Sequence, residues 1–304
     1  GPNFPYLFVI GNHDRWRWGG NKGYAKILKR KIANLPPGAC GSPYGDDDLG
    51  IRSLCRLSGI LFVMSGVGTA GSGHEQFIEQ TLARHRQAPW KICAWHKNQH
   101  DMQVGSKYDE VGWKSYQICA KYGAMIATGH EHSYSRTKTL TAIGNRSRAH
   151  GAIGSFDQVL LRPNHTFVFV SGLGGKSARP YSCFSHDDDT WWASIYASNY
   201  ILKNGVPLEP KDCDFMNPTR PQKTERTGVL FMDFNYLDDP RVARGQYMRP
   251  SRKHLAVKEW IRPETFQELA ETAKQLGFRS VASGPLVRSS YKAREFFELS
   301  QQNS

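Results

Sequence analysis

The sequence of 304 residues lacks any apolar run of about 18 residues, the length that a membrane-spanning helix needs. It has no visible signal peptide. It also lacks a block of Arg and Lys with interleaved aromatic residues, the pattern typical of nucleic-acid binding. Its basic balance, a formal net charge of +13 and a pI of about 9.5, suits anionic phosphate substrates, and it equally suits nucleic acid or no particular partner. We therefore expect neither a membrane nor a nucleic acid as a partner.

The six cysteines include no Cys-x-x-Cys pair, so their spacing excludes zinc ribbons and local cluster motifs. Cys93 and Cys119 lie in apolar segments, where a buried thiol is more typical than a bridge. We therefore expect these two residues to be core thiols. Two N-glycosylation triplets, Asn145-Arg146-Ser147 and Asn164-His165-Thr166, would matter only in a secreted protein.

Three short apolar runs are each followed at once by a histidine motif. The runs 6–10, 90–94 and 124–128 lead into Gly11-Asn12-His13-Asp14, Trp95-His96 and Gly129-His130-Glu131-His132. A short apolar run bounded by glycine and polar residues predicts a buried strand. In open α/β sheets, the residues just past the carboxyl ends of the strands line the ligand crevice. We therefore expect these motifs to meet at one edge of a sheet.

The side chains at this edge favour transition metals. Imidazole and amide groups suit Zn, Fe, Mn or Ni better than Ca. His130 and His132 are two residues apart, so in an extended segment both point to the same side. This spacing allows each to hold one ion of a pair, and metal pairs about 3.5–4 Å apart are a common solution for phosphoester hydrolysis.

Taken in order, Gly-Asn-His-Asp, a lone His after a strand and Gly-His-Glu-His resemble the calcineurin-like metallophosphoesterase superfamily, which includes the purple acid phosphatases. The resemblance covers residues 4–245. It implies an α/β fold of two packed β-sheets flanked by helices (an αββα sandwich), two transition-metal ions (Fe, Zn or Mn) and hydrolysis of a small-molecule or macromolecular phosphoester. It also implies that Asn12, His96 and His130 bind one metal, His132 binds the other, His13 assists the leaving oxygen and Asp14 orients His13.

Two motifs of that superfamily are missing. Its members supply the first metal with an Asp-x-His motif and the bridging carboxylate with a Gly-Asp motif, both upstream of Gly-Asn-His-Asp. The residues before Gly11 contain no Asp and no His. We therefore expect a domain shortened at its amino end, with an incomplete second metal site and impaired activity.

A second resemblance begins near residue 246. The segments 246–255 and 281–291 resemble the carboxyl end of lipoyl synthases, which are radical enzymes with two iron–sulfur clusters. The resemblance implies that Ser290 is a ligand of the auxiliary cluster. Thiolates hold such clusters, and no cysteine here has cluster spacing, so we expect Ser290 to be inert. We expect residues 246–304 to form a short appendage with a helix over 263–276 and a strand.

The two resemblances leave three functions open. The first is a two-metal phosphoester hydrolase. The second is a non-catalytic fusion remnant that binds one metal at most. The third is a lipoyl synthase, which the absence of cluster-spaced cysteines disfavours.

Periodicity predicts the remaining elements. It indicates helices over residues 21–35, from 73 onward and over 111–122, and strands over 60–64, 166–171 and 228–234. We expect His74 and His85 to be surface residues, and His186 to lie in a solvated acidic loop.

Overall fold

The computed structural model describes residues 6–20, 23–174, 177–209, 211–213, 228–234 and 243–248, together with Glu271 and Gln275. The chain forms two compact units, residues 1–254 and 255–304. The helix expected over 263–276 (apart from Glu271 and Gln275), the strand expected after it and Ser290 lie outside the described residues. The following description concerns the first unit.

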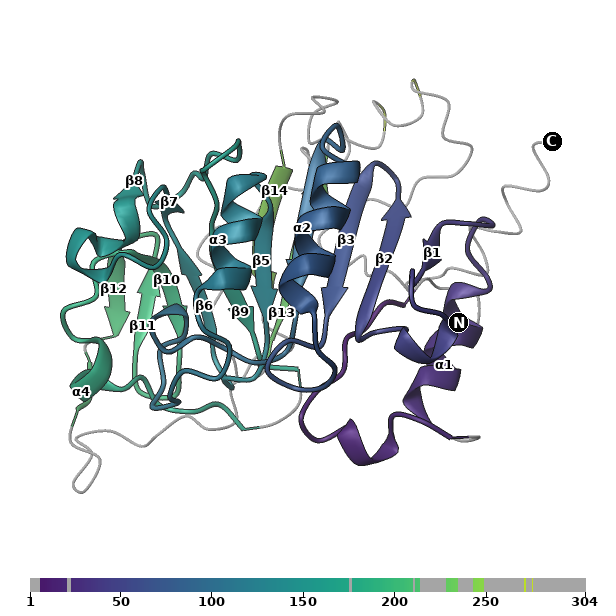
Figure 1. Ribbon diagram of the computed structural model, residues 1–304. Coiled ribbons are helices and arrows are strands. Elements are labelled where there is room, and N and C mark those ends of the chain that lie inside the picture. Colours follow the sequence, from purple (N-terminus) through teal and green to yellow (C-terminus); the bar gives the residue numbers. More distant parts are fainter. Residues whose placement is uncertain are drawn as a thin grey trace. The chain divides into compact units, whose positions relative to one another are not determined.

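Within the described residues, ten strands form one mixed sheet (Figure 1). In spatial order they are β1 (Cys40–Gly41), β2 (Arg52–Leu57), β3 (Ile60–Ser65), β4 (Trp90–Ala94), β5 (Met125–Thr128), β9 (Val168–Ser171), β6 (Tyr134–Thr137), β10 (Trp192–Tyr196), β11 (Ile201–Lys203) and β12 (Val206–Glu209). The central strands β3, β4, β5 and β9 are parallel. The flanking strands pair antiparallel.

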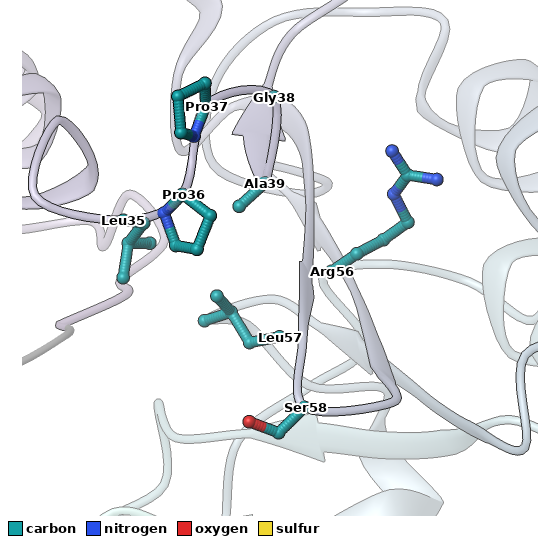
Figure 2. Close-up of a pocket in the computed structure, with 8 residues that line it drawn as sticks. All are labelled: Leu35, Pro36, Pro37, Gly38, Ala39, Arg56, Leu57 and Ser58. Atoms are coloured by element: carbon teal, nitrogen blue, oxygen red, sulfur yellow. The ribbon is translucent and has the colours of Figure 1, made fainter.

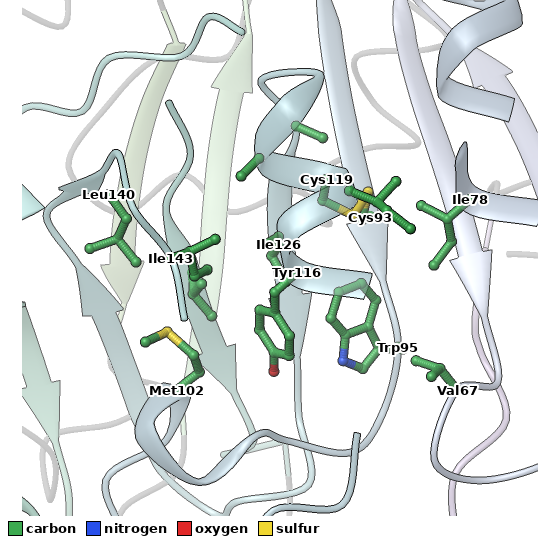
Figure 3. Packing of buried hydrophobic residues seen from close by; sticks show 14 of the residues in the cluster. Val67, Ile78, Cys93, Trp95, Met102, Tyr116, Cys119, Ile126, Leu140 and Ile143 are labelled. Atoms are coloured by element: carbon green, nitrogen blue, oxygen red, sulfur yellow. A yellow bond between two sulfur atoms is a disulfide. The ribbon is translucent and has the colours of Figure 1, made fainter. Parts of the chain in front are cut away.

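Two helices, α2 (His74–Arg84) and α3 (Lys114–Lys121), cover one face of the sheet (Figure 1). Each presents a buried apolar stripe to the sheet because its apolar residues recur at helical spacing. Phe77, Ile78 and Leu82 of α2 join Tyr116 and Ile118 of α3 in the main hydrophobic core. Figure 3 shows Ile78 and Tyr116 in this core. The helices expected from residue 73 onward and over 111–122 are confirmed as α2 and α3, and the strands expected over 60–64 and 166–171 are confirmed as β3 and β9.

A hairpin of β13 (Val229–Phe234) and β14 (Ala243–Met248) packs on the other apolar cluster of the sheet. Leu230, Met232 and Phe234 alternate along β13 and contact the cluster around Trp90 and Phe169, as the two-residue period of a strand requires. The α/β class is therefore confirmed. Two packed sheets were expected. The first is the ten-stranded sheet; in place of a second large sheet, the described residues have the two-stranded hairpin of β13 and β14 packed against it. A short pair, β7 (Thr139–Leu140) with β8 (Ala152–Ile153), completes the strands of the described part.

The strand expected over residues 6–10 is wrong. This run is irregular, and the amide of Ile10 donates to the carbonyl of Gly50 at 3.0 Å. Ile10 is buried in a small cluster with Trp18, Leu28 and Leu49, and Phe8 packs partly buried against it. Leu28 belongs to α1 (Tyr24–Ile32), whereas Tyr6 is exposed. Packing of Ile10 and Phe8 against this cluster, rather than pairing in the sheet, thus accounts for the apolar residues at the end of this run.

All six cysteines form disulfides, which corrects the expectation of core thiols. The pairs are Cys40–Cys55, Cys93–Cys119 and Cys183–Cys213. Cys93 on β4 and Cys119 on α3 are both fully buried in the main core (Figure 3). Packing of α3 over β4 brings together two sulfur atoms that lie 26 residues apart in the sequence.

Two histidines expected at the surface are buried instead. The ring of His74 lies 3.1 Å from the hydroxyl of Ser65 through Nδ1. His186, in the short helix α4 (Cys183–His186), is fully buried between the carboxylate of Asp189 (2.8 Å) and the carbonyl of Gly105 (2.9 Å). The side chain of Asp189, three residues after His186, is its buried partner, so the expectation of a solvated loop is wrong for His186, although Asp187 and Asp188 are exposed.

Candidate functional site

The site is built where β4 and β5 end. These neighbouring strands are parallel, with Ala94 opposite Ala127, so the residues that follow them leave the same edge of the sheet. The carbonyl of His96 accepts hydrogen bonds from the amides of Gly129 (3.2 Å) and His130 (2.9 Å). The two loops are thus joined directly at the histidines.

A second residue fastens the same loops. The Asn98 side chain donates to the hydroxyl of Thr128 at 2.6 Å and accepts from the amide of Glu131 at 3.2 Å. Asn98 is completely buried, and a buried amide side chain with its donor and acceptor both satisfied holds a local geometry firmly. Buried hydrogen bonds therefore fix the loop that carries His96 to the loop that carries His130.

Asn12, His96 and His130, which we call the histidine–asparagine cluster, converge at this edge. His96 Nε2 lies 2.7 Å from Asn12 Oδ1 and 3.0 Å from His130 Nδ1. The two rings meet edge to face with their centroids 4.7 Å apart. Three of the four residues expected to bind metal are thus brought together, even though the residues before Asn12 form no strand.

Burial keeps both imidazoles of the cluster neutral. Desolvation lowers the pKa of His96 to about 4, although the negative charges of Asp14 and Glu110 oppose the shift. Desolvation, aided by the positive charge of Lys107, lowers the pKa of His130 to about 3. Neutral imidazole is the form that binds metals, so near pH 7 both rings have a lone pair to offer.

The two expected catalytic residues lie in the turn that carries Asn12. His13 is exposed, and Asp14 is half-buried. The Asp14 carboxylate accepts the amide of Gly11 at 3.0 Å, which closes the turn. A Cβ on Gly11 would lie 2.8 Å from that carboxylate oxygen and 3.5 Å from the His96 ring, so only glycine fits this turn without displacement. No observation tests the roles predicted for His13 and Asp14.

Within the part of the chain that the structure describes, the two-metal centre implied by the first resemblance is absent. Among the described residues, no three side chains of His, Cys, Asp or Glu are grouped so that they could hold a metal ion. The expectation of two Fe, Zn or Mn ions is therefore wrong for this chain, because its cluster offers two imidazoles and an amide without the carboxylates that bridge a metal pair. His132 is half-buried, and its carbonyl accepts the amide of Arg179 at 2.9 Å. Its role as a ligand stays an untested prediction.

Sequence reasoning missed Glu110, which contacts the cluster from the loop before α3. Its Oε2 lies 3.2 Å from His130 Nε2, and its Oε1 lies 2.7 Å from Lys97 Nζ. Glu110 follows no apolar run and belongs to no motif, so no signal in the sequence marks it. An apolar hollow lies elsewhere, lined by residues 35–39 and 56–58 (Figure 2), and none of the expected site residues lines it.

No family model matches the chain. Parts of the chain are similar to lipoyl synthases. The mitochondrial lipoyl synthase of Caenorhabditis elegans is 64% identical over 56 residues, which are 18% of this chain and 16% of that protein. Lipoyl synthase 1 of Pisum sativum, also mitochondrial, is 55% identical over 83 residues, 27% of this chain and 19% of that protein. The lipoyl synthase of Coxiella burnetii is 48% identical over 118 residues, 39% of this chain and 35% of that protein. The chain thus spans about a third or less of the length of these relatives.

A purple acid phosphatase, PPD1 from seeds of yellow lupin (Lupinus luteus), is similar in structure at a TM-score of 0.45. It is 17% identical, and the match covers 64% of this chain and 34% of that one. A likeness this weak assigns no function. The expectation of a phosphoester hydrolase is therefore wrong by comparison, since the curated proteins similar to this chain in sequence are lipoyl synthases.

Proposed function

We propose that this protein binds a single divalent transition-metal ion at the histidine–asparagine cluster. This proposal corresponds to the second of the three functions left open by the sequence, a non-catalytic fusion remnant that binds one metal at most. The observation that carries the proposal is the convergence of Asn12 Oδ1, His96 Nε2 and His130 Nδ1, with separations of 2.7 and 3.0 Å from His96 Nε2 to the other two atoms. Ligands about 2.0–2.1 Å from one metal and at right angles to each other are about 3 Å apart, so the spacing fits a shared ion.

The chemistry of the donors supports the same proposal. Two neutral imidazoles and an amide oxygen favour borderline metals such as Zn²⁺ or Co²⁺ over Ca²⁺. Burial disfavours protonation of either ring, so protons would compete little with a bound ion near pH 7. The disulfides leave no cysteine thiolate to compete for the ion.

Titration of the intact protein with Co²⁺ and Zn²⁺ tests the proposal. We expect one equivalent of Co²⁺ to give visible absorption bands without the intense ultraviolet bands of a thiolate ligand, and Zn²⁺ to displace it. His96→Ala should abolish these bands, whereas His85→Ala, at the end of α2, should keep them. Failure of the unmodified protein to bind, or equal binding by His96→Ala, would contradict the proposal.

The sequence matches favour a second candidate function, which we propose as a lipoyl-synthase-type activity that uses an iron–sulfur cluster. It is supported by the 64% identity over 56 residues. Such clusters are held by thiolates, and all six cysteines here are in disulfides, so the candidate requires these bonds to be reduced first. Ser290, the expected cluster ligand, lies outside the described residues.

Anaerobic reconstitution of the fully reduced protein with iron and sulfide tests this second candidate. Bound iron and sulfide in equal amounts, diminished in Ser290→Ala, would support it. Protein that binds neither after complete reduction would contradict it, whatever the result with Co²⁺.

We also propose that the chain has two parts, a domain over residues 1–245 and a lipoyl-synthase-like segment over residues 246–304, whose first residues, 246–248, complete β14 of the domain. The hairpin of β13 and β14 is then the second layer of a sandwich whose first layer is the ten-stranded sheet. The apolar contacts of Leu230, Met232 and Phe234 with the sheet support this layering.

A further inference from the structure

We infer that Glu110 is a positioning residue of the metal site: its carboxylate holds His130 in the tautomer whose Nδ1 lone pair faces Asn12 and His96. The inference rests on the proposed metal-binding function and extends it to a residue outside the ligand motifs. A neutral imidazole carries one proton, on either Nδ1 or Nε2, and the partner of one nitrogen decides the state of the other.

The geometry places the carboxylate at the correct nitrogen. Glu110 Oε2 is 3.2 Å from His130 Nε2, the ring atom opposite to the one that faces the cluster. Both side chains are 9% exposed. Within the described part of the chain, Oε2 is buried and has no well-aligned hydrogen-bond donor. A proton on His130 Nε2, which lies 3.2 Å from this oxygen, would satisfy it once the two groups are aligned.

Glu110 is itself fixed to the loop that carries His96. Its amide donates to the carbonyl of Asn98 at 3.1 Å, and its Oε1 contacts Lys97 Nζ at 2.7 Å. Lys97 and Asn98 follow His96 directly. The segment of Glu110 also packs closely against Gly68, where an added Cβ would lie 2.6 Å from the Glu110 carbonyl oxygen. The carboxylate is thus positioned before any ion arrives.

This arrangement has two chemical consequences. With the proton on Nε2, His130 Nδ1 presents a lone pair to the point shared with Asn12 and His96. A carboxylate hydrogen-bonded to a ligating imidazole also makes that ligand more basic, and loss of such a partner typically weakens metal binding about 10- to 100-fold.

Two measurements on Glu110→Ala and Glu110→Gln test the inference. Competition with a chromophoric chelator gives the affinity for Zn²⁺, and ¹⁵N NMR of the imidazoles gives the tautomer of His130 in metal-free protein. We expect Glu110→Ala to bind Zn²⁺ about 10- to 100-fold more weakly, with the His130 proton shifted toward Nδ1. Glu110→Gln, whose amide oxygen still accepts a hydrogen bond, should retain the tautomer and lose less affinity. Glu79→Ala, which removes a carboxylate paired with Lys121 at the surface, is the matched control and should change neither quantity.

The outcomes separate this inference from the function on which it rests. If the unmodified protein binds Zn²⁺ and His96→Ala does not, but Glu110→Ala has unchanged affinity and an unchanged tautomer, Glu110 is not a positioning residue. If the unmodified protein fails to bind Zn²⁺, the proposed function is wrong, while the ¹⁵N spectrum still decides whether Glu110 sets the tautomer. Retained chemical-shift dispersion in each variant verifies that it is folded.

Discussion

At the scale of single residues, the cluster depends on histidines that folding keeps neutral. His96 and His130 are placed beside each other, so protonation of both would bring two positive charges together where burial already disfavours charge. Asp14 and Glu110 lie near enough to oppose the shift of His96, but burial outweighs them. Burial therefore keeps both histidines in the neutral form near pH 7.

This balance predicts how stability depends on pH. The pKa values of His96 and His130 in the folded protein, about 4 and about 3, lie below the ordinary value of about 6.5, so the unfolded chain binds more protons between these limits. The free energy of unfolding should therefore fall as the pH falls from about 6.5 toward 4, by at most about 1.4 kcal/mol per pH unit for each histidine. Urea unfolding at a series of pH values measures this dependence.

A comparison variant assigns the effect. His96→Asn removes one of the titrating groups, and its stability should depend less steeply on pH over the same range. An identical slope in both proteins would show that His96 does not lose protons on folding.

At the scale of elements, the edge of the sheet that carries the histidine–asparagine cluster depends on how β4 is held against α3. Trp95, directly after β4, packs edge to face on Tyr116 of α3 with ring centroids 4.9 Å apart (Figure 3). The hydroxyl of Tyr116 accepts the amide of Gln99 at 3.2 Å, just beyond His96. The Cys93–Cys119 bridge joins the same two elements. The helix thus supports the loop that presents the cluster.

The bridge should contribute measurably to stability. Replacing both Cys93 and Cys119 by Ala should lower the free energy of unfolding by about 2–4 kcal/mol, because the unfolded chain loses the constraint of a loop between residues 26 apart. Urea unfolding without reductant compares this double variant with the unmodified protein. Addition of a thiol reductant should bring the two closer together, and a double variant as stable as the unmodified protein would contradict the prediction.

At the scale of the whole molecule, the chain combines an α/β unit with sequence similarity to lipoyl synthases that spans about a third or less of those proteins. Its three disulfides are typical of oxidising environments. Among the described residues, no helix is long and apolar enough to cross a membrane. The histidine–asparagine cluster and the three disulfides all lie in the unit formed by residues 1–254.

Metal binding should stabilise this whole unit. An ion bound only by the folded protein adds about 2.7 kcal/mol when its free concentration is 100 times the dissociation constant. For a unit of this size, that gain should raise the melting temperature by roughly 5–10 °C. Differential scanning calorimetry with Zn²⁺, and again after addition of a chelator, measures the shift. A shift of equal size in His96→Ala would show that the ion acts elsewhere.

Much of the fold could be predicted from local pattern. The strands β3, β4, β5, β9 and β13 and the helices α2 and α3 form where apolar runs and helical spacing placed them, because the period of burial is written in neighbouring residues. Residues 6–10 have the same apolar character but form no strand. A local pattern reports that a run is buried, and it does not report whether a sheet or a helix buries it.

The sequence by itself determined which residues follow the ends of β4 and β5, and hence that His96 and His130 leave the sheet in similar loops. It also determined the similarity to lipoyl synthases, which overturned the function that the histidine motifs suggested. Its motifs further led us to expect that Asn12 meets the two histidines. Only the tertiary structure decided that Glu110 reaches His130 and that Cys93 bonds to Cys119. These are contacts between segments far apart in the chain. Their geometry is set by the packing of the sheet against its helices, which no short stretch of sequence contains.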